Sequence, residues 1–258
     1  MSSDDDALAR RAEEAGLNAS TPPQQAQIEG WLLRLSPGKA KRSRCVNALA
    51  AGTLPLGDLL ARCQQSFDAA DLPLIVRVTP FSQPADLDAQ LAARGWYSFD
   101  AADVMVLDSL PAEVPVQSPL TPKIDALDAD AYARLVGELR GSSAREIEAH
   151  AERLKSSPVP YRGFALRDDD TLLACGQYAR EDDIAGLFDI FTPAERRGHG
   201  HAATLCTALL QQAKAEGASR AYLQVGSDNT VAQRLYARLG FRFAYRYHYR
   251  AIDPRARD

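Results

Sequence analysis

The chain has 258 residues, of which 46% are hydrophobic and 25% are charged, a balance typical of a globular protein with room for one or two domains. Its formal net charge of -4 argues against a general nucleic-acid-binding surface. The acidic start resembles no secretion signal, and no apolar run approaches the ~20 residues of a membrane span, so we expect a cytoplasmic protein without membrane contact. The cysteines at 45, 63, 175 and 206 are widely spaced, so we expect free thiols and no metal site.

The first half of the chain alternates strand and helix patterns. Apolar runs and helical periodicity predict strands over residues 31–35, 40–48, 74–78 and 96–107 and helices over 56–69 and 85–94. A turn at Ser36-Pro37-Gly38 joins the first two strands into a predicted hairpin. The basic run from Lys39 to Arg44 lies on the return strand, and we interpret it as a solvated strand or turn because the chain as a whole is acidic.

A proline-rich segment separates this half from the second. Four prolines between Pro111 and Pro122 cannot sustain a helix and predict an extended linker over 113–122, between domains over 1–112 and 123–258. Downstream, the patterns predict helices over 128–140, 143–156, 200–216 and 229–239 and strands over 161–167, 172–179, 184–192, 221–225 and 241–252. Ser143 and Glu146 have the spacing of a capping box at the start of the second of these helices.

The two halves end with similar segments. In the first half, the strand over 74–78 and a helix lead to the sequence L-A-A-R-G-W at 91–96. In the second half, the strand over 221–225 and a helix lead to L-Y-A-R-L-G-F at 235–241. This similarity predicts an internal duplication.

The segment Arg197-Gly198-His199-Gly200-His201-Ala202 lies between a predicted strand and a long predicted helix. The first turn of a helix presents unpaired backbone N–H groups and the positive end of the helix dipole, and both favour a bound phosphate. Gly198 and Gly200 permit backbone angles and a close approach that a side chain would prevent, and Arg197 adds a positive charge. The sequence therefore predicts a phosphate-binding turn.

Two other interpretations of this turn remain open. A glycine-rich segment before a helix can be a tight loop that binds nothing. Residues 198–203 also match the dinucleotide fingerprint G-x-G-x-x-A, which follows its strand directly and begins a repeated parallel unit. Here residues 193–197 intervene and little of the chain remains afterwards, which disfavours the dinucleotide interpretation.

The turn resembles the Arg/Gln-x-x-Gly-x-Gly/Ala motif of the GNAT N-acetyltransferase superfamily, with Arg197, Gly200 and Ala202 at its fixed positions. The similarity continues through the segment that begins at Asn229 and ends in Leu239-Gly240-Phe241, and the elements follow the family's order from about Ile124. The resemblance implies an α/β (α+β) GNAT fold, in which helices flank a mixed, mostly antiparallel central sheet. It also implies two GNAT-like halves, as in tandem-type bacterial acetyltransferases.

The resemblance also implies the positions of the functional residues. Acetyl-CoA would contact the strand residues Ile190, Phe191 and Thr192, the turn residues Arg197, Gly198, His199, Gly200, His201 and Ala202, and the helix residues Asn229, Ala232 and Tyr236. Backbone N–H groups of the strand would bind the thioester oxygen and the pantetheine amides. Tyr236 would donate a proton to the departing CoA thiolate, although taken alone it is compatible with a core tyrosine. Asp189 is the candidate general base, with a solvated or salt-bridged aspartate as the alternative.

The sequence thus predicts an N-acetyltransferase that transfers the acetyl group of acetyl-CoA to a small-molecule or peptide primary amine by direct attack. The alternative is a non-catalytic module that binds or senses acyl-CoA, which would keep the turn but would not need Tyr236. The first half has Leu54-Pro55-Leu56-Gly57-Asp58 where its own turn should be, so we expect no cofactor there. We expect no nucleic-acid or membrane partner, and a homodimer is left open.

Overall fold

A computed structural model of the protein describes residues 3–110 and 123–257, and the predicted linker at 113–122 lies outside these ranges. Its helices are α1 (Ser3–Ala19), α2 (Leu56–Ala69), α3 (Leu87–Ala93), α4 (Ala129–Leu139), α5 (Ala144–Ser156), α6 (His201–Ala215) and α7 (Thr230–Arg238). Its strands are β1 (Gln25–Ile28), β2 (Trp31–Arg34), β3 (Val46–Ala48), β4 (Val76–Val78), β5 (Tyr97–Leu107), β6 (Lys123–Leu127), β7 (Tyr161–Asp168), β8 (Thr171–Glu181), β9 (Ile184–Phe191), β10 (Arg220–Gly226) and β11 (Arg242–Ala251). No helix in the described ranges is both long and apolar enough to cross a bilayer.

Elements with strong local signals form where the sequence predicts them. The helix α2 has the predicted ends, and the capping box of α5 is present, with Glu146 and Ser143 bonded in both directions. The return strand predicted over 40–48 is wrong in its first part, because Lys41–Ser43 form a short 3₁₀ turn and only Val46–Ala48 pair with β2. The helix α1 and the strand β1 were not predicted.

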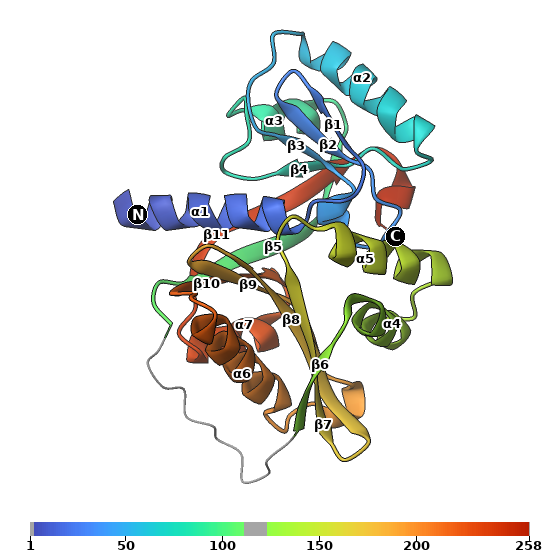
Figure 1. The fold of residues 1–258 in the computed structure, drawn as a ribbon. Helices are drawn as coiled ribbons and strands as arrows, with labels where there is room; N and C mark the ends of the chain where they lie inside the picture. Colours follow the sequence, from blue (N-terminus) through green and yellow to red (C-terminus); the bar gives the residue numbers. More distant parts are fainter. Residues whose placement is uncertain (1–2, 111–122, 258) are drawn as a thin grey trace.

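The strands form one continuous sheet in the order β1-β2-β3-β4-β11-β5-β10-β9-β8-β7-β6. Eight of the neighbouring pairs are antiparallel, and the pairs β3–β4 and β9–β10 are parallel, which confirms the predicted mixed, mostly antiparallel sheet. The strand β5, from the first half of the chain, lies between β10 and β11 of the second half. In Figure 1 the red strand β11 and the green strand β5 cross the middle of the molecule and connect its two ends.

The order of strands is symmetric about the central β11–β5 pair. The strand β4 neighbours β11 as β10 neighbours β5, and a parallel strand follows on each side. The last strand of each half is therefore placed beside the other half's sheet. This arrangement agrees with the internal duplication predicted from the sequence.

Helices cover both faces of the sheet. Along β5, Val104 and Val106 point into the apolar cluster beneath α1, whereas Met105 and Leu107 point into the cluster beneath α6. The helices α4 and α5 lie on the same face as α1, over β7 and β8, and α7 lies with α6 on the opposite face (Figure 1). The helices α2 and α3 cover the strands of the first half.

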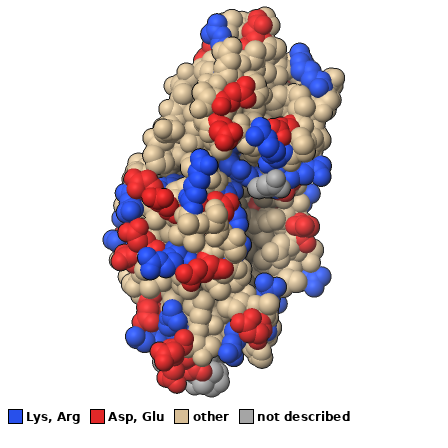
Figure 2. Space-filling view, turned by 90° about the vertical axis from the view of Figure 1, so that its right-hand side faces the viewer, with Lys and Arg blue, Asp and Glu red and all other residues tan. Residues whose placement is uncertain are grey.

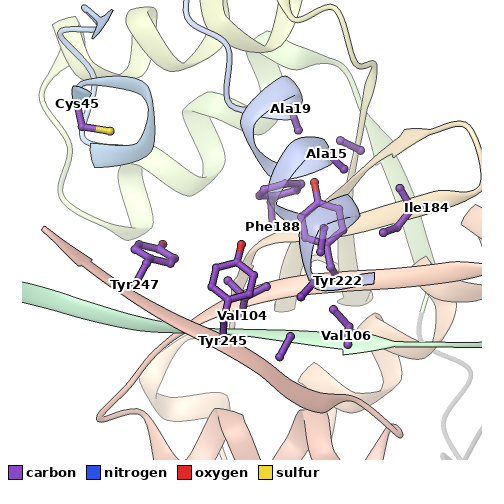
Figure 3. Packing of buried hydrophobic residues seen from close by; sticks show 14 of the residues in the cluster. Ala15, Ala19, Cys45, Val104, Val106, Ile184, Phe188, Tyr222, Tyr245 and Tyr247 are labelled. Atoms are coloured by element: carbon purple, nitrogen blue, oxygen red, sulfur yellow. The ribbon is translucent and has the colours of Figure 1, made fainter. Parts of the chain in front are cut away.

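The unpredicted helix α1 packs across the centre of the sheet through small side chains. Ala9, Ala12, Ala15 and Ala19 follow a helical spacing and are all buried. Figure 3 shows Ala15 and Ala19 close to the rings of Phe188 and Tyr222. The same helix supplies Glu13, whose carboxylate accepts two hydrogen bonds from Arg77 of β4, at 2.5 and 2.9 Å. One helix thus contacts strands from both halves.

Candidate active site

The predicted phosphate-binding turn connects β9 to α6. The backbone angle φ is +82° at Gly198 and +81° at Gly200, a left-handed conformation that favours glycine. Gly200 is the N-cap of α6 and provides no side-chain cap, so the N–H groups of the first helical turn remain available. A Cβ added at Gly198 or Gly200 would meet no protein atom within 4 Å. The turn is therefore open to a ligand.

Side chains around the turn leave this face polar. Arg197 is exposed, and its Nε donates a hydrogen bond to the carbonyl oxygen of Thr192 at 3.2 Å. The hydroxyl of Thr192 is buried without a partner among the described residues. The rings of His199 and His201 lie 5.9 Å apart, and burial together with the neighbouring His199 lowers the pKa of His201. A neutral His201 leaves the turn's charge to arginine and to the helix dipole.

The strands β9 and β10 separate just before this turn. They pair in parallel only from Ile184 to Leu187, opposite Arg220 to Leu223. Beyond this point β10 continues alongside β5 as far as Gly226, and β9 continues alongside β8. In the described sheet, the edge of β9 from Phe188 onward is thus unpaired on its β10 side. This opening can accept an extended ligand that bonds to the strand edge.

A β-bulge in β9 controls which side chains point to each face. Asp189 and Ile190 lie opposite a single residue of β8, Gly176, and Asp189 has a φ of +51°. As a result, Phe188 and Asp189 both line a cavity beside α4 and α5, whereas Ile190 packs against the cluster beneath α6. Phe191 then packs against the cluster of α4 and α5.

The carboxylate of Asp189 is held by several partners. One oxygen accepts a hydrogen bond from Arg140 at 2.8 Å, and the other accepts one from the amide of Gln177 at 2.7 Å. The second oxygen also lies 3.6 Å from Nε2 of His150. Burial raises the pKa of Asp189, but the positive groups around it, with Arg140 the strongest, together outweigh this effect and hold the pKa well below its usual range. These contacts favour the salt-bridged interpretation of Asp189 over a free base.

The cavity beside Asp189 has a volume of about 200 Å³ and lies between α4, α5 and the loop that follows β2. His150 of α5 lines it, and its Nε2 is buried without a hydrogen-bond partner among the described residues. Burial lowers the pKa of His150 to about 4, although Asp189 opposes the shift. His150 is therefore neutral at physiological pH and retains a lone pair.

The helix α7 brings the predicted tyrosine to the opposite face. The side chain of Asn229 caps α7 by accepting a hydrogen bond from the backbone N–H of Ala232 at 3.1 Å. Tyr236 is buried in the cluster beneath α6, against which Ala232 and Ile190 also pack. Burial raises the pKa of Tyr236 far above its ordinary value, so its hydroxyl stays protonated. The hydroxyl has no hydrogen-bond partner in the described ranges.

In the first half, an internal carboxylate lies just before the corresponding helix. Glu29 accepts hydrogen bonds from the backbone N–H groups of Thr53 and Leu54, at 2.6 and 3.1 Å, just before α2. Asp58 adds a second negative charge to the first turn of α2. A phosphate would be repelled there. The absence of a cofactor in this half remains a prediction.

Comparison with known proteins identifies the family. The model of the acetyltransferase (GNAT) family matches residues 130–241, which include the turn, the bulged strand and α7. The protein described as "Uncharacterized N-acetyltransferase YobR" from Bacillus subtilis (strain 168) is 27% identical over 228 residues, which cover 88% of this chain and 91% of YobR. Residues 130–241 are thus an acetyltransferase domain of the GNAT family.

Solved structures show the same fold over both halves of this acetyltransferase. A GCN5-related N-acetyltransferase from Kribbella flavida has a TM-score of 0.70 at 19% identity and covers 95% of each chain. A tandem GNAT protein from the clavulanic acid biosynthesis pathway has a TM-score of 0.65 at 18% identity, covering 92% of this chain and 87% of that one. These likenesses confirm the predicted fold class.

Two residues that line the cavity, Arg42 and His150, were not predicted from the sequence as site residues. His150 was not singled out, although it lies beside the apolar stripe of Ile147, Ala151 and Leu154 on α5. The interpretation of the basic run as solvated is wrong in part, because Arg44 is buried and Arg42 lines the cavity. Their burial depends on contacts with distant elements, which a local pattern does not reveal.

The low pKa of His150 predicts a loss of stability in weak acid. The unfolded chain binds a proton at His150 near pH 6.5, whereas the folded chain binds it only near pH 4, so the free energy of unfolding falls as the pH drops through this range. Between pH 7 and 5 this group alone should cost about 2 kcal/mol. Urea unfolding at pH 7 and pH 5 measures this loss. The free energy of unfolding of His150→Gln should fall between these pH values by about 2 kcal/mol less than that of the wild type.

The matched control for this experiment is His201→Gln, on the exposed turn, which should keep most of the wild-type acid sensitivity. Asp189 raises the pKa of the nearby Arg140 further above this range, and the pKa of Asp189 lies below the range. Identical pH dependence of the wild type and His150→Gln would contradict the assignment of a neutral, buried His150.

Proposed function

We propose that this acetyltransferase takes its acetyl group from acetyl-CoA and transfers it to a primary amine by direct attack. The observation that carries the proposal is the separation of β9 from β10 after Leu187, directly before an open glycine turn and beside a cavity on the opposite face. A donor that enters along this opening would meet an acceptor in the cavity at the bulge of β9. No other part of the described chain combines these features.

The donor would be held by backbone groups of the turn and the strand. The pyrophosphate would accept hydrogen bonds from the first-turn N–H groups of α6, at His201 and Ala202, with Arg197 supplying positive charge. The pantetheine amides would pair with the free edge of β9 from Ile190 to Thr192, as an added strand does. The unpartnered hydroxyl of Thr192 supports a polar ligand at this edge.

The chemical step would take place where the two faces meet. The amine nitrogen attacks the thioester carbonyl carbon, the carbon–sulfur bond breaks, and the acetyl group becomes an amide. An alkylamine has a pKa of ~10 and must first lose a proton. Water at the cavity would take this proton, while Asp189, the acid first considered for this role, accepts a hydrogen bond from Arg140 and lies 3.6 Å from Nε2 of His150.

Tyr236 would complete the reaction on the α7 side. Its hydroxyl is protonated, and Ile190 of β9 packs against the same cluster, so the donor sulfur would pass nearby. Proton donation from the phenol to the departing thiolate prevents the reverse attack. The products are the acetylated amine and CoA, with one proton released from the acceptor.

Gly200→Val should weaken CoA binding about a hundredfold or more, because a side chain would occupy the space next to the first-turn N–H groups that bind phosphate. Calorimetry with CoA measures the affinity. The control is Gly217→Val, at the other end of α6, where φ is +105° and the surroundings are equally open. It imposes a similar backbone strain far from the turn, and its CoA affinity should equal that of the wild type. A folded Gly200→Val protein with unchanged affinity would refute the turn assignment.

Tyr236→Phe keeps the packing of the ring but removes the proton that the thiolate would take. We expect kcat to fall by about 10²–10⁴, with little change in the affinity for acetyl-CoA, because the interaction matters mainly in the transition state. The control is Tyr222→Phe, which alters a fully buried tyrosine of β10 and should leave kcat near the wild-type value. If Tyr236→Phe retains full kcat, Tyr236 has no part in the proton transfer.

A further inference from the structure

The cavity beside Asp189 contains more positive than negative charge. Its ionised side chains are Lys39, Arg42, Arg140, Arg153, Glu146 and Asp189. Arg140 pairs with Asp189 at 2.8 Å, and Lys39 lies 3.7 Å from a carboxylate oxygen of Glu146. His150 is neutral. The remaining two charges belong to Arg42 and Arg153.

These two guanidinium groups have only neutral hydrogen-bond partners among the described residues. Arg42 donates one hydrogen bond, from Nη1 to the side-chain oxygen of Gln224 at 2.7 Å. Arg153 donates one from Nη1 to the hydroxyl of Tyr161 at 3.2 Å. Arg153 is 6% exposed, and the carboxylate that acts on it, Asp189, is hydrogen-bonded to Arg140 instead. Several N–H groups of each guanidinium are thus free to bind an anion.

Aromatic rings place the two guanidinium groups in one region. Arg42 lies over the ring of Phe188 at 5.4 Å, and Arg153 lies over the ring of Tyr161 at 5.3 Å. These two rings contact each other, with centroids 5.3 Å apart. The hydroxyl of Tyr161 is itself fixed by donating to the carbonyl oxygen of Ala19 at 2.8 Å. The pair is therefore supported on a rigid base.

The surrounding surface carries charges of both signs. In Figure 2, which shows the side of the molecule that carries α4 and α5, Lys and Arg atoms gather across the middle beside a hollow. Arg42 comes from the first half of the chain and Arg153 from the second. The half in which we expect no cofactor thus supplies part of this region.

We propose that the acceptor is a small amine that also carries a carboxylate, as an amino acid does, and that Arg42 and Arg153 bind this carboxylate. This inference rests on the proposed function. The amino group lies toward His150 and the bulge of β9, and the carboxylate lies toward the two arginines, all of which line the same cavity. Guanidinium groups bind carboxylates through charge-assisted, often bidentate hydrogen bonds. The volume of about 200 Å³ is below the ~300–1,000 Å³ of pockets for drug-sized ligands, which favours a small acceptor.

Matched pairs of acceptors test this proposal. Each amino acid of a set is compared with its carboxamide and with the amine that lacks the carboxyl group, using acetyl-CoA and mass spectrometry of the products. We expect kcat/KM to be at least about 100-fold higher for the best acid than for its amide, because the amide lacks the charge that both arginines bind. A separate set of assays uses aminoalkyl phosphonates, in which a phosphonate replaces the carboxylate.

Substitutions at the two arginines test whether they are the source of the preference for acids over amides. Arg42→Gln and Arg153→Gln should each lower kcat/KM for the best acid about 10- to 100-fold more than kcat/KM for its amide, so that the ratio of acid to amide falls toward one. Arg42→Lys and Arg153→Lys keep the charge and should retain part of the preference. The control is Arg134→Gln, on the exposed side of α4, which should keep the wild-type ratio.

A binding measurement separates this inference from the proposed function. The N-acetylated acid should raise the melting temperature of the wild type but not that of the two glutamine variants, whose own melting temperatures show whether they fold. Equal kcat/KM for acids and amides, or a preference for phosphonates over carboxylates, would overturn the carboxylate assignment while leaving the acetyltransferase mechanism intact. Failure to bind CoA or to acetylate any amine would instead overturn the proposed function.

Discussion

The insertion of β5 between β10 and β11 is the constraint on which the rest of the structure depends. Without β5, two long strands of the second half would have unpaired edges, and the apolar clusters on both faces would lose their central side chains, Val104 to Leu107. The helix α1 then covers this junction, and its Glu13 pairs with Arg77 of the first half. The two halves are therefore one structural unit, although their sequences suggest a tandem repeat.

This shared sheet explains how two unequal halves contribute to one site. The second half has the glycine turn, the bulged strand and Tyr236. The first half has Glu29 just before α2, where it accepts hydrogen bonds from the N–H groups of Thr53 and Leu54. Its loop after β2 instead reaches the cavity with Arg42. We infer that the first half has exchanged a cofactor role for a role in binding the acceptor, and that the bulge in β9 lets the donor and the acceptor approach from opposite faces.

Local patterns in the sequence predicted much of this structure. Glycines before a helix identified the turn, and the position of Asn229 at a helix start identified a cap, because both depend on a few neighbouring residues. The helix α1 was not predicted because its buried face consists mainly of alanines, whose hydrophobicity differs little from that of residues on an exposed helix face. The partners of β5, the neutral state of His150 and the burial of Arg44 could not be predicted, since each depends on packing between different elements of the fold.

The most direct test of this account is to produce residues 1–112 and 123–258 as separate chains and to measure cooperative unfolding and CoA binding for each chain alone and for the mixture. If β5 completes the sheet, residues 123–258 alone should show no cooperative unfolding transition and no CoA binding, and the mixture should recover both. The account would be contradicted if residues 123–258 alone unfolded cooperatively and bound CoA as tightly as the intact chain, because the donor site would then be independent of β5.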